Sequence, residues 1–389
     1  MRNLVFFFFL MAYSPISWAQ PICGADQTWK YLKELRGKRV ACMVNPTSVL
    51  TYQRDKPIHL VDFLKSQKIN LQIIFAPEHG FRGEAEAGAH IRDGVDSKTG
   101  VKVISLYGNK KKPSKKDLDS VDVVIFDIQD VGVRFYTYLG SLHYLIEACS
   151  EFQKKLIVLD RPNPNGHYVD GPVLDTSYKS FVGMHPVPVV HGCTVGEYTQ
   201  MMVGEKWVKT SKNFKYTIIP LKNYDHQTRY ILPVAPSPNL PNELSIYLYP
   251  SLCFFEGTTL SLGRGTSTPF QVVGAPWCPD TSFSFTPISI KGKAENPPHK
   301  NQKCYGRNYQ TEVYKLLREK QIRLQPLLEF YSMKQDSTLF FIPFFNQLAG
   351  TDQLRKQIEK GWKEEEIRAT WKPDLQKYLA IRKKYLLYP

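Results

Sequence analysis

A glutamate and a histidine follow a mostly apolar run at a point where a buried strand would end. Residues 71–76 form that run, and Pro77 stops it directly before Glu78, His79 and Gly80. Open α/β sheets place their chemistry in the crevice at the carboxyl ends of their strands. A carboxylate beside an imidazole at such a point could hold a proton-transfer group in a fixed place. The alternative interpretation is a strand-terminating turn with two solvated polar side chains.

Two further apolar runs also end in acidic residues. The run over residues 121–128 contains Asp127 and is followed by Asp130. The run over residues 156–159 is followed by Asp160. The runs are short and continuous, and helical patterns separate them, which is typical of a parallel sheet covered on both faces. Right-handed crossovers bring the carboxyl ends of such strands to one edge. We therefore predict an α/β fold in which these carboxylates and Glu78 meet in one cleft.

A cleft with several carboxylates favours glycoside hydrolysis. One carboxylic acid protonates the leaving oxygen, and a second carboxylate usually acts as nucleophile or base. Glu78, Asp127, Asp130, Asp160 and Glu256 could supply such a pair. The sequence does not contain the motifs of three competing chemistries. It has no HExxH metal motif, no P-loop for nucleotides and no GxSxG elbow of a serine hydrolase. We therefore expect neither a metal nor a cofactor.

Composition and charge limit the class of protein. The 389 residues are 42% hydrophobic and 22% charged, which fits a globular chain of two domains. The formal net charge of +15 suits an anionic partner. Nucleic acid is not the expected partner, because no RNP, zinc-finger or helix-turn-helix signature is present.

The first residues have the pattern of a secretory signal. Arg2 precedes an apolar run over residues 4–12, and Ser17-Trp18-Ala19 is a small-x-small cleavage site. We expect cleavage after Ala19 and an exported protein, periplasmic or secreted. Because no later segment is long and apolar enough to span a bilayer, we expect no stable membrane insertion.

Seven cysteines are scattered along the chain without a C-x-x-C pair. An exported protein meets an oxidising environment that permits disulfides. Cys278 and Cys304 flank a polar stretch, and we expect a bridge between them.

Seven ordered motifs resemble those of the exo-β-N-acetylmuramidase family. They are APEHGFRGEAEAG (76–88), DVVIFDIQDVGVRFYTY (122–138), LDRPNPNG (159–166), DGPVLD (170–175), PVVHGCTVGEY (188–198), SPNLP (237–241) and FEGTTLSLGRGTSTPFQVVGAPW (255–277). The resemblance extends from about residue 40 to residue 388.

The resemblance implies a Rossmann-like N-terminal domain with a parallel sheet and a smaller α+β C-terminal domain that closes the cleft. We assign residues 1–19 to the signal, 20–236 to the catalytic domain and 237–389 to the auxiliary domain. The implied reaction removes terminal N-acetylmuramic acid from the non-reducing end of peptidoglycan fragments. Glu78 of the EHG motif is the implied catalytic glutamate.

The remaining roles are hypotheses. His79 would orient Glu78, and Asp127 or Asp130 would be the second carboxylate or would stabilise the transition state. The N-acetyl group of the substrate is a third possibility as nucleophile. Muramic acid carries a lactyl carboxylate, so a site that binds it needs a cationic side chain. The expected substrate contacts are Arg82, Arg134, Tyr136, Asn163, Glu256, Arg264 and Thr266.

A non-catalytic protein that binds peptidoglycan fragments in the same cleft is the competing hypothesis. Incubation with a disaccharide substrate distinguishes the two, because a binding protein would release no product. The sequence leaves open the stereochemical outcome and the oligomeric state.

Overall fold

The computed structural model describes residues 20–82, 93–335 and 337–389. The expected signal at residues 1–19 lies outside these ranges, as does the part of the first motif that covers residues 83–88. No helix within the described ranges is long and apolar enough to cross a membrane.

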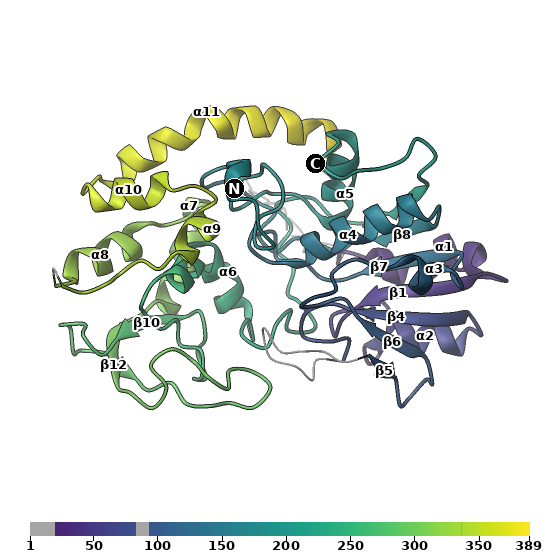
Figure 1. The fold of residues 1–389 in the computed structure, drawn as a ribbon, viewed down its shortest axis with the longest axis horizontal. Helices are drawn as coiled ribbons and strands as arrows, with labels where there is room; N and C mark the ends of the chain where they lie inside the picture. Colours follow the sequence, from purple (N-terminus) through teal and green to yellow (C-terminus); the bar gives the residue numbers. More distant parts are fainter. Residues whose placement is uncertain (1–19, 83–92, 336) are drawn as a thin grey trace, which may run out of the picture.

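A seven-stranded sheet forms the centre of the N-terminal region (Figure 1). Its order is β5-β6-β4-β1-β7-β8-β9, and every neighbouring pair is parallel except β5 with β6. The strands are β1 (Arg39–Val44), β4 (Asn70–Ala76), β5 (Gly94–Val95), β6 (Lys102–Ser105), β7 (Val123–Asp127), β8 (Lys155–Leu159) and β9 (Tyr216–Ile219). The α/β fold predicted from the short apolar runs is confirmed.

Both faces of this sheet are buried, which explains the continuous apolar runs. Successive side chains point to opposite faces, so Phe126 joins one hydrophobic cluster and Ile125 joins the other. The helices packed on the two faces are α4 (Tyr138–Glu151) and α5 (Val195–Gly204) with Phe126, and α1 (Thr28–Leu35) and α2 (Leu60–Ser66) with Ile125. Smaller elements of this region are α3 (Lys115–Leu118), β2 (Val49–Leu50) and β3 (Ile58–His59).

The C-terminal region is smaller and combines helices with a short antiparallel sheet. Its strands are ordered β10-β12-β11 and comprise β10 (Val272–Ala275), β11 (Ser284–Phe285) and β12 (Cys304–Asn308). Its helices are α6 (Glu243–Leu252), α7 (Val313–Glu319), α8 (Gln325–Met333), α9 (Phe344–Ala349), α10 (Gln353–Glu359) and α11 (Glu364–Arg382).

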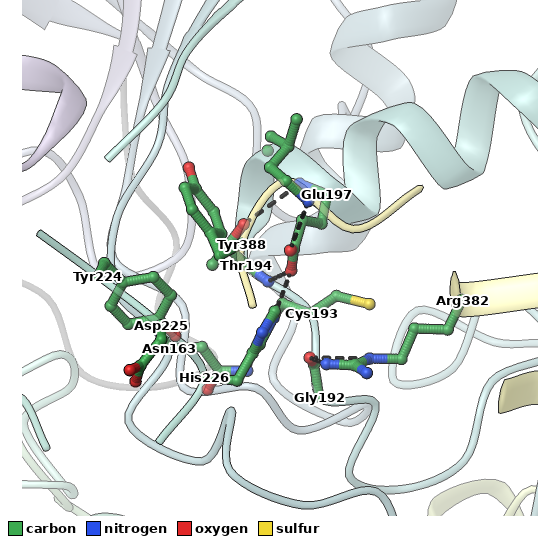
Figure 2. A network of polar contacts seen from close by, with 12 residues as sticks. Asn163, Gly192, Cys193, Thr194, Glu197, Tyr224, Asp225, His226, Arg382 and Tyr388 are labelled. Carbon is green, nitrogen blue, oxygen red and sulfur yellow. Dashed lines mark hydrogen bonds and ion pairs between the residues drawn. The ribbon is translucent and has the colours of Figure 1, made fainter. Parts of the chain in front are cut away.

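Helix α11 leads the chain back from the C-terminal region to α5 (Figure 1). The residues after it bind the N-terminal region in the network of Figure 2. There the Leu387 amide donates to the buried Glu197 carboxylate at 2.9 Å, and His226 Nε2 lies 2.9 Å from the same carboxylate. The Tyr388 hydroxyl donates to Asp160 at 2.6 Å. The two regions are therefore joined at the end of the chain as well as through the segment that precedes α6.

The seven cysteines are all buried and all free. The expected bridge between Cys278 and Cys304 is thus wrong for this structure. Both thiols lie in the packed C-terminal region, where burial raises the pKa of Cys278 to about 11 and that of Cys304 to about 12. Each therefore behaves as a small buried side chain.

Arg134 is buried between the two regions, and all its hydrogen bonds to described residues go to backbone oxygens. Its Nη1 donates to Pro172 and Val187 at 2.7 and 2.8 Å, and its Nη2 donates to Leu348 and Ala349 at 2.9 and 2.7 Å. Burial lowers the pKa of Arg134 to about 9. The guanidinium therefore links the loops that follow β8 to the end of α9.

Replacement of Arg134 by lysine should destabilise the protein by about 3 kcal/mol. A lysine ammonium cannot reach four carbonyl oxygens in this fixed arrangement, so buried acceptors lose their donors. Urea unfolding of Arg134→Lys checks this, with Arg318→Lys at an exposed position of α7 as the matched control. Equal stability of the two variants would contradict the structural role.

Candidate active site

A tight turn presents Glu78 at the carboxyl end of β4. The Gly80 amide donates to the Pro77 carbonyl at 3.0 Å, which closes the turn around Glu78 and His79. His79 has φ 67, a left-handed conformation that few residues other than glycine adopt. Such a conformation costs energy and persists only where the surrounding structure holds it. The turn therefore fixes the direction of the Glu78 side chain.

Two hydroxyl groups hold the half-buried carboxylate of Glu78. The Tyr107 hydroxyl donates to Oε1 at 2.7 Å, and the Thr137 hydroxyl donates to Oε2 at 2.8 Å. The Tyr138 hydroxyl donates to the Glu78 carbonyl at 3.3 Å. These partners come from the segment after β6 and from the start of α4, so two neighbouring elements place the carboxylate.

Glu78 lines a cavity of about 350 Å³ that also contains a second carboxylate, and we call it the Glu78 cavity. Its polar lining consists of Glu78, His79, Tyr107, Thr137, Tyr138, Ser237, Glu256 and Arg264. Its aromatic lining includes Phe135, Tyr136, Phe181, Tyr249, Phe270 and Phe344. A few polar groups among aromatic side chains are typical of a small-ligand site.

Glu256 faces this cavity as part of an ion pair. Arg264 donates from Nε and Nη2 to Glu256 Oε1 at 2.9 and 2.5 Å, and the Cys253 thiol lies 3.4 Å from Oε2. The Arg264 guanidinium also lies 5.0 Å from the centre of the Phe270 ring. Glu256 belongs to the short helix Cys253–Gly257, and Arg264 to the following glycine-rich turn. The C-terminal region thus contributes one fixed anion and one fixed cation.

The structure places Asp127 away from this cavity, in a buried ion pair. Arg161 Nε donates to Oδ1 at 2.6 Å and Nη2 donates to Oδ2 at 2.9 Å, with both side chains at most 2% exposed. A carboxylate bonded in this bidentate way and shielded from water has a structural role. Asp127 therefore does not share the Glu78 cavity.

Asp130 is also buried and lies outside the lining of the cavity. Its Oδ1 accepts the Gly132 amide at 2.7 Å and lies 3.9 Å from His191 Nε2, while Oδ2 has no hydrogen-bond partner among the described residues. Burial raises the pKa of Asp130 to about 7 and lowers the pKa of His191 to about 3. The two groups therefore form a neutral pair in acidic solution.

The expected substrate contacts divide into two groups. Tyr136, Glu256 and Arg264 line the Glu78 cavity, and the Tyr136 hydroxyl donates to the Pro236 carbonyl at 2.5 Å. Arg134 is engaged with backbone carbonyls, as described above. The Asn163 amide is buried and donates to the Cys193 carbonyl at 2.9 Å.

Thr266 and Arg82 also have internal partners. The Thr266 hydroxyl donates to the Gly263 carbonyl at 2.6 Å and accepts from the Thr268 amide at 3.1 Å. Arg82 donates to Asp96 at 2.9 and 2.8 Å and to Asp62 at 3.1 Å. Arg82 lines an adjacent cavity, which it shares with His79.

The whole chain is similar to known proteins. Family models described as the N-terminal and C-terminal parts of the exo-β-N-acetylmuramidase NamZ match residues 40–244 and 247–388. The chain belongs to the NamZ family. The predicted boundary at residue 236 lies within the first match, and the division into domains stays a prediction.

Relatives of this NamZ chain match over nearly its full length. The peptidoglycan β-N-acetylmuramidase NamZ of Bacillus subtilis (strain 168) is 36% identical over 379 residues, with 92% of this chain and 89% of the relative covered. Two DUF1343 family proteins from Bacteroides fragilis NCTC 9343 have crystal structures of the same fold. They are 48% and 26% identical, with TM-scores of 0.85 and 0.76, and in each case 95% of this chain and 99% of the other are covered.

Sequence reasoning missed Tyr107 and Thr137, the two side chains that bond to the Glu78 carboxylate. Tyr107 follows the strand β6, so the rule that strand ends carry the site could have found it. Thr137 lies inside a quoted family motif, between two tyrosines. Within the described residues, no three His, Cys, Asp or Glu side chains form a metal-binding group. The expected absence of a metal stays a prediction.

Asp130→Asn should change the slope of stability against pH between about pH 4 and pH 7, because it removes one of two opposing contributions, that of Asp130 and that of His191. The pKa of Asp130 is about 7 in the folded protein, against about 3.9 in an unfolded chain. The folded Asp130 carboxyl therefore holds one more proton in this window, and its own contribution to stability falls as pH rises, by at most about 1.4 kcal/mol per pH unit. The asparagine side chain of the variant does not titrate, so this contribution is lost. Urea unfolding of both proteins at pH 5, 6 and 7 measures the difference, and parallel pH profiles would refute the prediction.

Proposed function

We propose that the protein is an exo-acting glycoside hydrolase that releases N-acetylmuramic acid from the non-reducing end of peptidoglycan fragments. The single observation that carries this proposal is Glu78, held by two hydroxyl groups in an aromatic cavity. Membership of the NamZ family and likeness to a peptidoglycan β-N-acetylmuramidase support the substrate.

Glu78 serves as the general acid and then as the general base. The acid delivers its proton to the glycosidic oxygen as the bond to the sugar breaks, and the base later takes a proton from the attacking water. Tyr107 and Thr137 fit both states, because a hydroxyl group can donate to a carboxylate and accept from a carboxylic acid. Both oxygens therefore keep a partner through the cycle.

Glu256 supplies a second negative charge in the cavity that Glu78 lines. Its bonds to Arg264 keep it in a fixed position, where an anion stabilises the oxocarbenium-like transition state. Asp127 and Asp130, the other candidates, are buried outside the cavity lining. The nucleophile is then either Glu256 or the N-acetyl group of the substrate, and the latter agrees with the engagement of Glu256 by Arg264.

Arg264 is the cation for the lactyl carboxylate of muramic acid. Among the three arginines considered, it alone lines the Glu78 cavity. Its bonds to Glu256 use Nε and Nη2, and Nη1 has no hydrogen bond to a described residue. A guanidinium can bind two carboxylates from different sides because its five N–H groups lie in one plane.

Export agrees with this substrate and remains part of the proposal. The pattern at residues 1–19 directs the chain out of the cytoplasm. Peptidoglycan is found outside the cytoplasm, so an exported enzyme can reach it. A formal net charge of +15 raises the encounter rate with an anionic polymer.

Glu78→Gln should lower kcat/KM on a chromogenic N-acetylmuraminide by roughly 1,000-fold, since the amide cannot donate a proton to the leaving oxygen. Release of the chromophore measures this, with Glu365→Gln on the exposed face of α11 as the control. Near-normal turnover by the Glu78 variant would overturn the assignment. Binding of a disaccharide by the native protein without any product would favour the competing binding function.

Arg264→Gln should lower kcat/KM on the muraminide by roughly 10- to 100-fold, the value of one charge-assisted hydrogen bond to a carboxylate. The same change should lower the rate on an N-acetylglucosaminide by a smaller factor, because that reaction loses only the fixed position of Glu256 and has no lactyl contact to lose. The ratio of the two rates is therefore the decisive measurement. An unchanged ratio would mean that another group binds the lactyl carboxylate.

A further inference from the structure

A second cavity adjoins the Glu78 cavity on the side of His79. It has a volume of about 610 Å³, and we call it the lysine cavity because Lys291 and Lys293 belong to its lining. The two cavities have three lining residues in common, His79, Tyr138 and Ser237. They therefore meet next to the residue that follows Glu78.

The position of Glu78 determines which part of a substrate reaches the lysine cavity. A general acid must touch the glycosidic oxygen, which joins the released sugar to the leaving group. When the terminal sugar occupies the Glu78 cavity, the leaving group therefore begins beside Glu78. From there the lysine cavity is the adjoining space, because His79 lines both cavities.

The charges in the lysine cavity favour an anionic occupant. Lys291 and Lys293 are exposed, and neither forms an ion pair with a described residue. Arg82 also lines this cavity, but Asp96 and Asp62 already neutralise it. Among the described lining residues, the two lysines therefore carry the positive charge that no carboxylate neutralises.

The turn that carries these lysines is attached to the catalytic segments. The Asn239 side chain donates to the Lys293 carbonyl at 2.9 Å, and Ser237 Oγ lies 3.5 Å from His79 Nε2. The Ile288 amide donates to the Gly265 carbonyl at 2.9 Å, directly beside Arg264. The SPNLP motif and the glycine-rich turn thus hold the lysine turn against both sides of the site.

The other walls of the lysine cavity are rigid and largely apolar. The ring of proline fixes the backbone angle φ, and the residue has no N–H group. Prolines therefore offer flat surfaces without an unsatisfied amide donor. The prolines of this lining are Pro46, Pro236, Pro238 and Pro241. Flat apolar walls with cations at the edge suit a sugar chain that carries carboxylates.

We propose that the lysine cavity binds the leaving-group saccharide, and that Lys291 and Lys293 select leaving groups that carry a carboxylate. The inference rests on the proposed hydrolase function and adds the part of the substrate that is not released. The preferred substrate is then a chain with at least one further muramic acid, because the neighbouring N-acetylglucosamine is neutral.

Three substrates distinguish the contributions of the two cavities to the rate. A chromogenic N-acetylmuraminide has a small leaving group, the disaccharide N-acetylmuramic acid–N-acetylglucosamine has a neutral sugar as leaving group, and the trisaccharide extended by a second N-acetylmuramic acid has an anionic one. The Lys291→Ala/Lys293→Ala double variant should lose about 10-fold in kcat/KM on the trisaccharide and less than about 2-fold on the other two. The loss should shrink at high salt, since both lysines are exposed.

Two control variants make the result specific. Lys209→Ala/Lys212→Ala removes the same charge from exposed positions that precede β9, away from both cavities, and should leave all three rates unchanged. Lys291→Arg/Lys293→Arg keeps the charge and should retain most of the activity on the trisaccharide.

The outcomes distinguish this inference from the proposed function. A native protein that hydrolyses none of the three substrates would refute the hydrolase function itself. If the native protein is active and the Lys291/Lys293 alanine variant matches it on the trisaccharide, the inference is overturned. An equal loss on the chromogenic substrate would also overturn it, because the lysines would then act on the released sugar.

Discussion

The buried ion pair between Asp127 and Arg161 is the constraint on which the catalytic edge of the sheet depends. It joins the end of β7 to the residues after β8, and Arg161 Nη2 also donates to the Val49 carbonyl at 3.0 Å. Neither charge reaches water, so the loss of one partner would cost about 3–5 kcal/mol. The pair therefore fixes the ends of β7 and β8 and the start of β2 relative to one another before any substrate is bound.

Glu78 differs from Asp127 in the charge of its partners and from Asp160 in its exposure. Asp127 is opposed by a guanidinium, and Asp160 accepts hydrogen bonds from Thr194, Gly196 and Tyr388 in a fully buried position. Glu78 is half-buried and has two neutral hydroxyl partners. A carboxylate held in this way can exchange a proton with a ligand without leaving an unpaired charge in the protein.

The sheet and Glu78 could be predicted from sequence because both depend on local patterns. Continuous apolar runs indicate strands that are buried on both faces, and Pro77 and Gly80 mark the turn at the end of β4. The assignment of partners could not be predicted, because it depends on where side chains point after folding. Asp130 and Arg134 are four residues apart in one motif, yet one contacts Gly132 and the other contacts Leu348.

The fixed contacts between the two regions also explain why a chain end is the natural substrate. Arg134 joins the regions at α9, and the residues after α11 join them again at Glu197 and Asp160. Helix α11 has 19 residues, about 28 Å at 1.5 Å per residue, and connects these two places. A hinge at one place would have to break the other. Walls held at two places suit one terminal sugar in the Glu78 cavity, with the rest of the chain left outside it.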